Sequence, residues 1–266
     1  MTHALAVLLT GQWRFKRVLY ASAKAELKKR YAGSLLGPIW PVLYPLLFLS
    51  VYLFVWLVVF NVRFPGLGRL DYVVFVFSGL VPFLYLMDTL THSSVVIKQN
   101  IQLVKSVIMP VELIATRTVV VGLVSHLVGL ALLVGLSLVN GNLSWRFACL
   151  PLLLAIQLLW LTGLAWILAP LGVVLPDIGH LVSVLSMLLM FVSPIAFKPD
   201  MVPPVYRAVL RLNPVTYMVG AYRWVIIGPD EARGVVFAGF AGLALATFVL
   251  GALFCRRFKG FIVDFE

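Results

Sequence analysis

Charged residues are scarce in this 266-residue chain, since they make up 12% of it while hydrophobic residues make up 62%. Soluble domains carry about 25% charged residues and about 45–50% apolar residues. A water-soluble chain this apolar could not cover its surface with polar groups, and intrinsic disorder requires low hydrophobicity. The composition therefore excludes both classes and indicates an integral membrane protein.

Cysteine and the common catalytic motifs are also rare or missing. The two cysteines, Cys149 and Cys255, lie in apolar runs and offer no disulfide framework. The sequence has no G-x-x-x-x-G-K-[ST] loop, no C-x-x-C, no H-E-x-x-H and no G-x-S-x-G. We therefore expect no ATP-binding loop, no metal site and no enzymatic activity in this chain.

What the sequence does have is six long stretches free of Asp, Glu, Lys and Arg, namely Ala32–Val62, Tyr72–Met87, Thr118–Trp145, Phe147–Pro176, Ile178–Phe197 and Gly234–Cys255. A helix needs roughly 20 residues to cross the hydrocarbon core, and the second run reaches this length by continuing through Asp88 to Leu90. Barrel strands would alternate over segments of about 10 residues. The runs therefore predict an all-α membrane protein with six spans, at about residues 39–61, 72–90, 113–139, 147–173, 179–197 and 234–255.

Basic residues predict the orientation of these spans. With the N-terminus inside, the inner segments hold twelve Lys and Arg and the outer segments hold eight. Seven of the inner ones lie within 17 residues, from Arg14 to Arg30. Because Lys and Arg accumulate in cytoplasmic segments, we expect both termini in the cytoplasm. The net charge of +11 then reflects topology and contacts to anionic lipid headgroups.

The segment 1–38 precedes the first span and is interpreted as a cytoplasmic interface segment. On a helical wheel four basic residues fall within a sector of roughly 80°, with apolar residues opposite; the basic residues are Arg14, Arg17, Lys24 and Lys28, and the apolar ones Phe15, Leu19, Ala23 and Leu27. This pattern favours an amphipathic helix on the membrane surface. A positively charged tail with no specific role is the alternative.

Two further segments separate the spans. Residues 91–110 carry no acid and are long for a connector, which favours a short helix that docks a cytoplasmic partner. Residues 198–233 are external yet largely apolar, with two potential short helices, Val205–Leu212 and Val215–Ile227, separated by Asn213–Pro214. A re-entrant hairpin, rather than a simple loop, is the preferred interpretation of this external segment.

The first span carries aromatic residues at a strict spacing of four: Trp40, Tyr44, Phe48, Tyr52, Trp56 and Phe60. Each step drifts by about 40° around a helix, so this aromatic stripe winds slowly along the span. One explanation is packing in lipid or against helices, with the end residues in the aromatic belts. The other is a ladder for sugar rings, because Tyr and Trp combine an apolar body with a polar group. The pattern alone leaves both open.

Ionisable residues within the spans are candidates for function. His126 lies in the middle of a span, where a neutral histidine facing a neighbouring helix is the commoner case. Asp88 and His92 are four residues apart, so they can satisfy each other on one helix.

Several stretches resemble one known family. Residues 28–40 (KKRYAGSLLGPIW) are similar to the start of the first span in ABC-2 type permeases that export polysaccharides, and residues 100–112 (NIQLVKSVIMPVE) are similar to the cytoplasmic coupling region of that family. The resemblance continues through Asp177–Gly179, Phe191–Ile195 and Leu212–Pro214, and so covers nearly the whole chain in order. The chain departs from the pattern at Pro176, where relatives often have a basic residue.

The resemblance implies a homodimeric permease with two copies of a separate ATPase, which binds ATP and Mg²⁺. The implied substrate is an undecaprenyl- or other lipid-linked glycan, with O-antigen first and capsular polysaccharide or teichoic acid as alternatives. An ABC-2 drug or lipid exporter would gain little from the aromatic stripe. A membrane-bound transferase would need clustered acids or histidines, and the ten acids here do not cluster.

The resemblance also implies roles for particular residues of the transmembrane domain, residues 39–266, and of the segment before it. The aromatic stripe is expected to line the substrate path. Basic residues are expected to receive the anionic lipid head, because charge-assisted contacts to phosphate are strong; they are Lys24, Lys28, Lys29 and Arg30. The residues expected to couple the chain to its ATPase are Gln99, Asn100, Ile101, Leu103 and Lys105.

Overall fold

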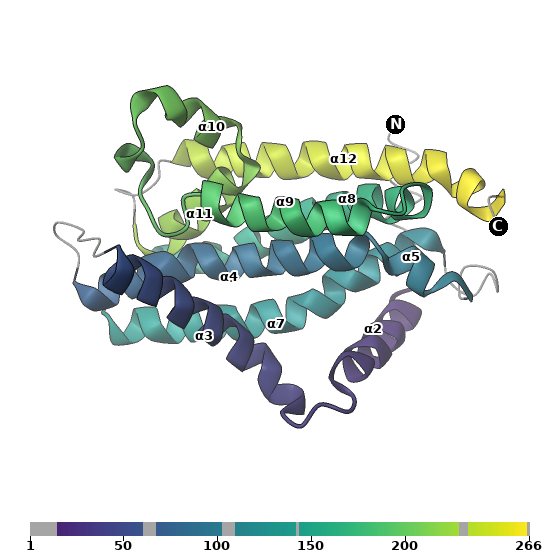
Figure 1. The fold of residues 1–266 in the computed structure, drawn as a ribbon, viewed down its shortest axis with the longest axis horizontal. Helices are drawn as coiled ribbons and strands as arrows, with labels where there is room; N and C mark the ends of the chain where they lie inside the picture. The colour runs from purple at the N-terminus through teal and green to yellow at the C-terminus, as the bar shows by residue number, and fades with distance from the viewer. Residues whose placement is uncertain (1–14, 61–67, 103–109, 142–143, 229–233, 265–266) are drawn as a thin grey trace.

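The computed structural model describes residues 15–60, 68–102, 110–141, 144–228 and 234–264, and within these ranges its regular structure is entirely helical. The long helices run side by side along the long axis of the molecule, while α2 (Lys16–Tyr31) and α3 (Trp40–Leu53) form a V against one flank (Figure 1). The all-α fold class predicted from the sequence is confirmed.

Five helical segments of the described chain are long and apolar enough to cross a membrane. They are Gly37–Val59 (η1, α3 and η2), Arg69–Ser93 (α4), Val111–Val139 (α7), Trp145–Val174 (η3 and α8) and Val235–Phe258, which lies within α12 (Gly234–Asp264). The remaining predicted span, the fifth in chain order at about residues 179–197, corresponds to α9 (Ile178–Val192). Its 15 residues give a length of about 22 Å, which is less than the hydrocarbon core of about 30 Å.

Local sequence sets where the helices end. Helix α4 starts after Gly68, whose N–H donates to Asp71 Oδ2 at 2.9 Å, and continues past Asp88 to Ser93. Helices α8 (Leu150–Val174) and α9 end just before Leu175 and Ser193, which have extended backbones and precede prolines. The prediction of a helical span to residue 197 is therefore wrong at its C-terminal end.

Helix α3 has an irregular backbone. It follows η1 (Gly37–Ile39), contains Pro45, and continues as the π-helical turn η2 (Phe54–Val59), in which Phe60 N–H donates to the Val55 carbonyl at 2.9 Å. In an apolar 18-residue stretch of this span only 17% of the residues are buried, against 78% in the corresponding stretch of α4. Helix α3 is therefore the peripheral span, and α4 is the central one.

The core between α4, α7, α8, α11 and α12 is filled by large side chains, among them Phe75, Phe77, Phe83, Trp166, Tyr222 and Phe240. Helices α8 and α12 pack closely against each other at Gly163 and Gly251. A Cβ on Gly163 would lie 2.6 Å from Phe248 Cα, and a Cβ on Gly251 would collide with the Gly163 carbonyl oxygen. Only glycine fits this contact.

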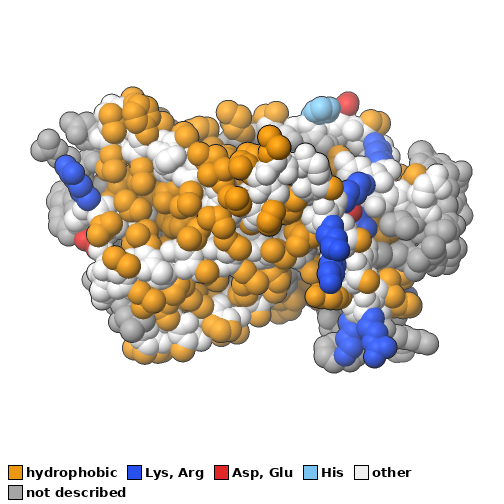
Figure 2. All heavy atoms as spheres, turned by 90° about the horizontal axis from the view of Figure 1, so that it is seen from below, with side chains coloured by type: hydrophobic (Ala, Val, Ile, Leu, Met, Phe, Trp, Pro, Cys, Tyr) orange, Lys and Arg blue, Asp and Glu red, His pale blue; other side chains and the backbone are white. Residues whose placement is uncertain are grey.

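Short elements occupy the two ends of the bundle. Helix α5 (Val96–Gln99), α2 and the C-terminal part of α12 lie at one end, and α10 (Arg207–Leu212) and α11 (Pro214–Ile226) lie at the other (Figure 1). The turns η4 (Pro199–Met201) and η5 (Pro204–Tyr206) lead into α10. A broad apolar surface separates the ends, and most basic side chains visible on that face gather at the α2 end (Figure 2).

Candidate functional site

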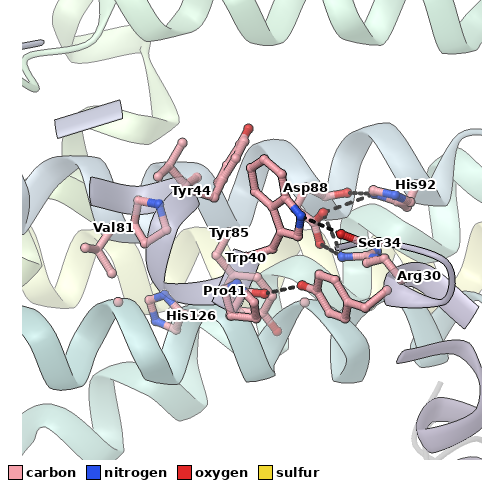
Figure 3. A pocket seen from close by; sticks show the side chains of 16 residues that line it. Arg30, Ser34, Trp40, Pro41, Tyr44, Val81, Tyr85, Asp88, His92 and His126 are labelled. Carbon is pink, nitrogen blue, oxygen red and sulfur yellow. Dashed lines mark hydrogen bonds and ion pairs between the residues drawn. The ribbon is translucent and has the colours of Figure 1, made fainter. Parts of the chain in front are cut away.

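A pocket of about 460 Å³ lies between the V of α2 and α3 and the helices α4 and α7 (Figure 3). Polar side chains gather at one side of it, while Val81 and His126 lie at the other. The polar group consists of Arg30, Ser34, Asp88 and His92, and the remaining lining is largely apolar, including Pro41, Pro45, Val81 and Leu84. The pocket therefore suits a molecule with a polar end and an apolar body.

An ion cluster holds the polar side of this pocket. Arg30 Nη1 donates to Asp88 Oδ1 at 3.0 Å and to Oδ2 at 3.1 Å. His92 Nδ1 lies 3.2 Å from Asp88 Oδ1 and 2.8 Å from the Asp88 carbonyl. The sequence predicts the contact between Asp88 and His92, which is confirmed. The sequence does not predict that Arg30 joins this cluster, because Arg30 and Asp88 are 58 residues apart in the chain.

A second set of contacts docks α2 on α7. The buried Arg117 lies 3.5 Å from Glu26 Oε2 and donates to Ser22 Oγ at 3.0 Å. Ala23 is buried and Leu19 packs against the core. The inner face of α2 thus contacts α7 through charged groups as well as apolar ones, which the helical-wheel pattern does not predict.

The four residues predicted to receive a lipid head lie in two different environments. Lys24, Lys28 and Lys29 are exposed on the outer face of α2. Arg30 is partly buried in the pocket wall, where Asp88 accepts its hydrogen bonds. Arg14, which belongs to the same predicted basic sector, lies outside the described residues. The three lysines are accessible to an anionic head, whereas the hydrogen bonds to Asp88 hold Arg30 in the pocket wall.

A tight loop brings the start of the aromatic stripe into the pocket. Gly33 and Gly37 have φ angles of 77° and 43°, which favour glycine. Trp40 Nε1 donates to Ser34 Oγ at 2.9 Å, and the Tyr31 hydroxyl lies 3.4 Å from Ser125 Oγ on α7. These contacts fix the turn between α2 and α3, so that Trp40 and Arg30 line the same pocket.

The six aromatic residues of the stripe do not share one environment. Tyr44 lines the pocket, and its ring centroid lies 4.8 Å from that of Phe48. Tyr52 is buried and donates to the Met190 carbonyl of α9 at 3.1 Å. Trp56 lies 5.6 Å from Phe60, which is 62% exposed. The stripe thus passes from the pocket, past one hydrogen bond to α9, to an exposed surface, and its role in substrate passage stays a prediction.

A buried polar network crosses the core beside the pocket. His126 Nε2 lies 3.1 Å from the Tyr222 hydroxyl, which donates to Gln157 Oε1, and Gln157 Nε2 donates to the Pro82 carbonyl at 3.1 Å. The His126 ring also stacks on Tyr85 at 4.8 Å. His126 therefore faces neighbouring helices, which is the commoner case named above.

The predicted coupling residues lie at the α5 end of the bundle. Gln99 is exposed beside Lys98, whereas Asn100 is half-buried and donates from Nδ2 to the Val96 carbonyl at 2.8 Å. Ile101 packs against the core, and Leu103 and Lys105 lie outside the described residues. The expectation of one helix for residues 91–110 is wrong at its start, because residues 91–93 complete α4 and α5 is separate.

Comparison with known proteins connects this architecture to a family. Residues 17–227 match the family model of the ABC-2 type transporter. The O-antigen export system permease protein RfbA of Myxococcus xanthus is 28% identical over 219 residues, covering 81% of this chain and 82% of that protein. A Klebsiella pneumoniae protein of the same name is 29% identical over 209 residues, covering 77% and 78%. With a match across most of its length, this chain belongs to the ABC-2 type transporter family.

Proposed function

We propose that this chain is the permease subunit of an ABC exporter that moves a lipid-linked polysaccharide across the cytoplasmic membrane. O-antigen is the preferred cargo in this proposal. The observation that carries the proposal is the similarity to O-antigen export permeases over about four fifths of both chains. ATP hydrolysis belongs to a separate ATPase subunit, two copies of which serve the transporter. Capsular polysaccharide and teichoic acid are alternative cargoes within the same family.

The aromatic stripe supports a glycan rather than a small apolar cargo. Tyr44 and Phe48 lie side by side on α3, and Tyr44 borders the pocket. Flat rings with polar edges suit sugar rings, which have apolar faces and hydroxyl edges. In this proposal Lys24, Lys28 and Lys29 receive the phosphate of the lipid head, and the stripe carries the sugars.

We propose that two copies assemble, each with six spans and both termini in the cytoplasm. Two helices support this assembly, because α3 and α9 expose apolar faces, which on membrane proteins contact lipid or a partner. These faces include Val42, Leu46 and Val51 on α3, Phe54 and Val58 on its continuation η2, and Leu181, Val184, Leu188 and Phe191 on α9. In this arrangement α9 is the short fifth span, and α5 lies on the cytoplasmic side with the ATPase.

The external segment 198–233 is proposed to form a re-entrant hairpin. Tyr222 on α11 contacts His126, which lies near the middle of α7, and Gln157 on α8. A helix that reaches this depth while α10 stays at the end of the bundle enters the membrane without crossing it. Asn213 supports the bend, since its side chain accepts from Val215 N–H and donates to Ser193 Oγ, both at 2.9 Å.

The proposed function is tested by reconstituting export in bacteria that synthesise the O-antigen glycolipid but lack their own exporter. The chain is expressed with its ATPase, and surface glycan on intact cells is measured by immunoblot against total glycan. We expect surface glycan only when both proteins are present. Glycan that stays inside cells holding the folded, assembled complex would contradict this cargo.

A pair of leucine substitutions separates sugar stacking from packing. Tyr44→Leu with Phe48→Leu keeps much of the apolar volume, which packing tolerates well, but removes two flat faces. The control is Trp145→Leu, because Trp145 is 76% exposed and belongs to another span, so it lies off the stripe and off the two proposed contact faces. We expect the pair to reduce export strongly at unchanged folding and the control to export normally. Full export by the pair would show that the stripe is structural.

A further inference from the structure

The external segment carries a set of basic residues that the proposed topology does not explain. Lys and Arg are expected on the cytoplasmic side, yet residues 198–233 contain Lys198, Arg207, Arg211, Arg223 and Arg233. Three of these arginines line one pocket of about 300 Å³ at the α10–α11 end of the bundle. Among the described residues that line it, one is acidic, namely Asp200. We call it the arginine pocket; it is lined by Arg207, Arg211, Arg223, Thr216, Tyr217 and Asp200.

Arg207 is held in place by backbone groups. Its Nε donates to the Val202 carbonyl at 2.9 Å, and its Nη2 donates to the Asp200 carbonyl at 3.1 Å. These bonds use two of the five N–H donors of the guanidinium. A guanidinium fixed in this way loses little further freedom when it binds a ligand, which favours a specific site over a loose surface contact.

Arg223 places a buried positive charge in the same pocket. Its side chain is 2% exposed, its Nη2 donates to the Ile195 carbonyl at 2.6 Å, and its Cζ lies 3.5 Å from the centre of the Phe75 ring. A cation that is shielded from water attracts an anion more strongly than an exposed one. Arg223 therefore supplies attraction from the inside of the pocket, while Arg211 supplies it from the exposed side.

Thr216 gives an independent sign of a ligand. Its Oγ1 is buried and has no hydrogen-bond partner in the described part of the chain, although the residue lines the pocket. Buried hydroxyl groups in folded proteins are nearly always hydrogen-bonded. An oxygen of a bound anion would accept the missing hydrogen bond.

We propose that the arginine pocket binds a phosphoryl group. Arginine is the side chain best suited to phosphate, because its planar fork donates two parallel hydrogen bonds, and three arginines outweigh the one aspartate. Apolar lining residues, including Pro194, Leu210 and Val236, suit the group to which the phosphate is attached. The phosphoryl group comes from a lipid headgroup or from free phosphate; its location on the outer face rests on the orientation in the proposed function.

The test uses the purified full-length chain in non-ionic detergent, with binding measured by native mass spectrometry. The probes are dioleoyl phosphatidic acid and dioleoylglycerol, which differ only in the phosphate. We expect Arg211→Gln to weaken binding of phosphatidic acid about tenfold, because hydrogen bonds to charged groups are strong, and to leave dioleoylglycerol unchanged. Arg211 is exposed, so this variant is expected to fold.

Two further variants make the test specific. Thr216→Val removes the buried hydroxyl without changing the charge, and we expect it to weaken binding several-fold at unchanged or higher thermal stability. Arg69→Gln is the matched control, because Arg69 begins α4 at the same end of the bundle but does not line the pocket. Equal losses for Arg211→Gln and Arg69→Gln, or unchanged binding in both Arg211→Gln and Thr216→Val, would overturn the proposal.

Competition identifies the source of the phosphate. Displacement of phosphatidic acid by millimolar inorganic phosphate supports a site that binds the phosphoryl group by itself. Resistance to inorganic phosphate, together with the loss in Arg211→Gln, supports a site for lipid-borne phosphate. Both results are obtained without the ATPase or any glycan, so failure of the proposed cargo leaves this test intact.

Discussion

Breaking the ion pair between Arg30 and Asp88 should release α2 from the bundle. Exposed pairs contribute about 0.2–1 kcal/mol, whereas breaking a buried pair costs about 3–5 kcal/mol. The Arg30 and Asp88 side chains are 20% and 26% exposed, between these limits. We therefore expect a coupling energy of about 1.4–2 kcal/mol, which changes the ratio of docked to undocked α2 by about tenfold to thirtyfold.

The assay measures how often α2 undocks. Ala23 is 6% exposed on the docked face, so an Ala23→Cys variant, in a chain with Cys149 and Cys255 replaced by alanine, should react with maleimide only when α2 leaves α7. We expect Arg30→Gln and Asp88→Asn each to accelerate labelling by about tenfold. Because both remove the same contact, the double variant should label scarcely faster than either one.

Lys28→Gln is the control, because it removes one positive charge from the exposed face of the same helix. Its labelling rate should match that of the parent chain. The reasoning is refuted if Arg30→Gln labels no faster than Lys28→Gln. It is also refuted if the free-energy change in the double variant equals the sum of the changes in the two single variants to within about 0.3 kcal/mol, because independent sites behave in this way.

Three other predictions concern packing, coupling and the core. Gly163→Ala should destabilise the chain by about 1–3 kcal/mol through overpacking, lowering the thermal unfolding midpoint, while Gly242→Ala, where no atom lies within 4 Å of the new Cβ, should not lower it. Lys98→Ala with Gln99→Ala should reduce co-purification of the ATPase at unchanged thermal stability, because both side chains are exposed; full co-purification would remove them from the coupling surface. Gln157→Leu should cost about 1–3 kcal/mol, because it strands buried polar groups, and an unchanged midpoint would show that the network adds no stability.

The spans were predictable because their signal is local. The predicted helical positions at about 113–139 and 147–173 lie within a few residues of the bounds of α7 and α8, and the run extended through Asp88 covers most of α4. Prolines also act locally, so the sequence signals the end of α8 before Pro176. The end of α9 was missed because the apolar run continues to Phe197 while Pro194 already stops the helix.

The candidate site was predictable only in part because its contacts are distant in sequence. Arg30 and Asp88 are 58 residues apart, and Tyr222 and His126 are 96 apart. A helical wheel identifies which face of α2 is basic, but it cannot show that Arg30 is in the wall of a pocket. The spacing of the stripe likewise does not reveal that Tyr52 bonds α9, because that depends on how two helices pack.

The filled core of the bundle has a consequence for leakage. With Trp166, Tyr222 and Phe83 fully buried and His126, Gln157 and Tyr222 joined by hydrogen bonds, the core in the described part of one chain is filled by side chains at these positions. In the proposed function, the sugar polymer then travels along the outside of α3, and the seam between two copies forms the wall of its path. In the proposed dimer, leakage of ions therefore depends on the seam between the two copies. The exporter preserves the proton gradient of the membrane only if this seam is closed when no cargo is passing.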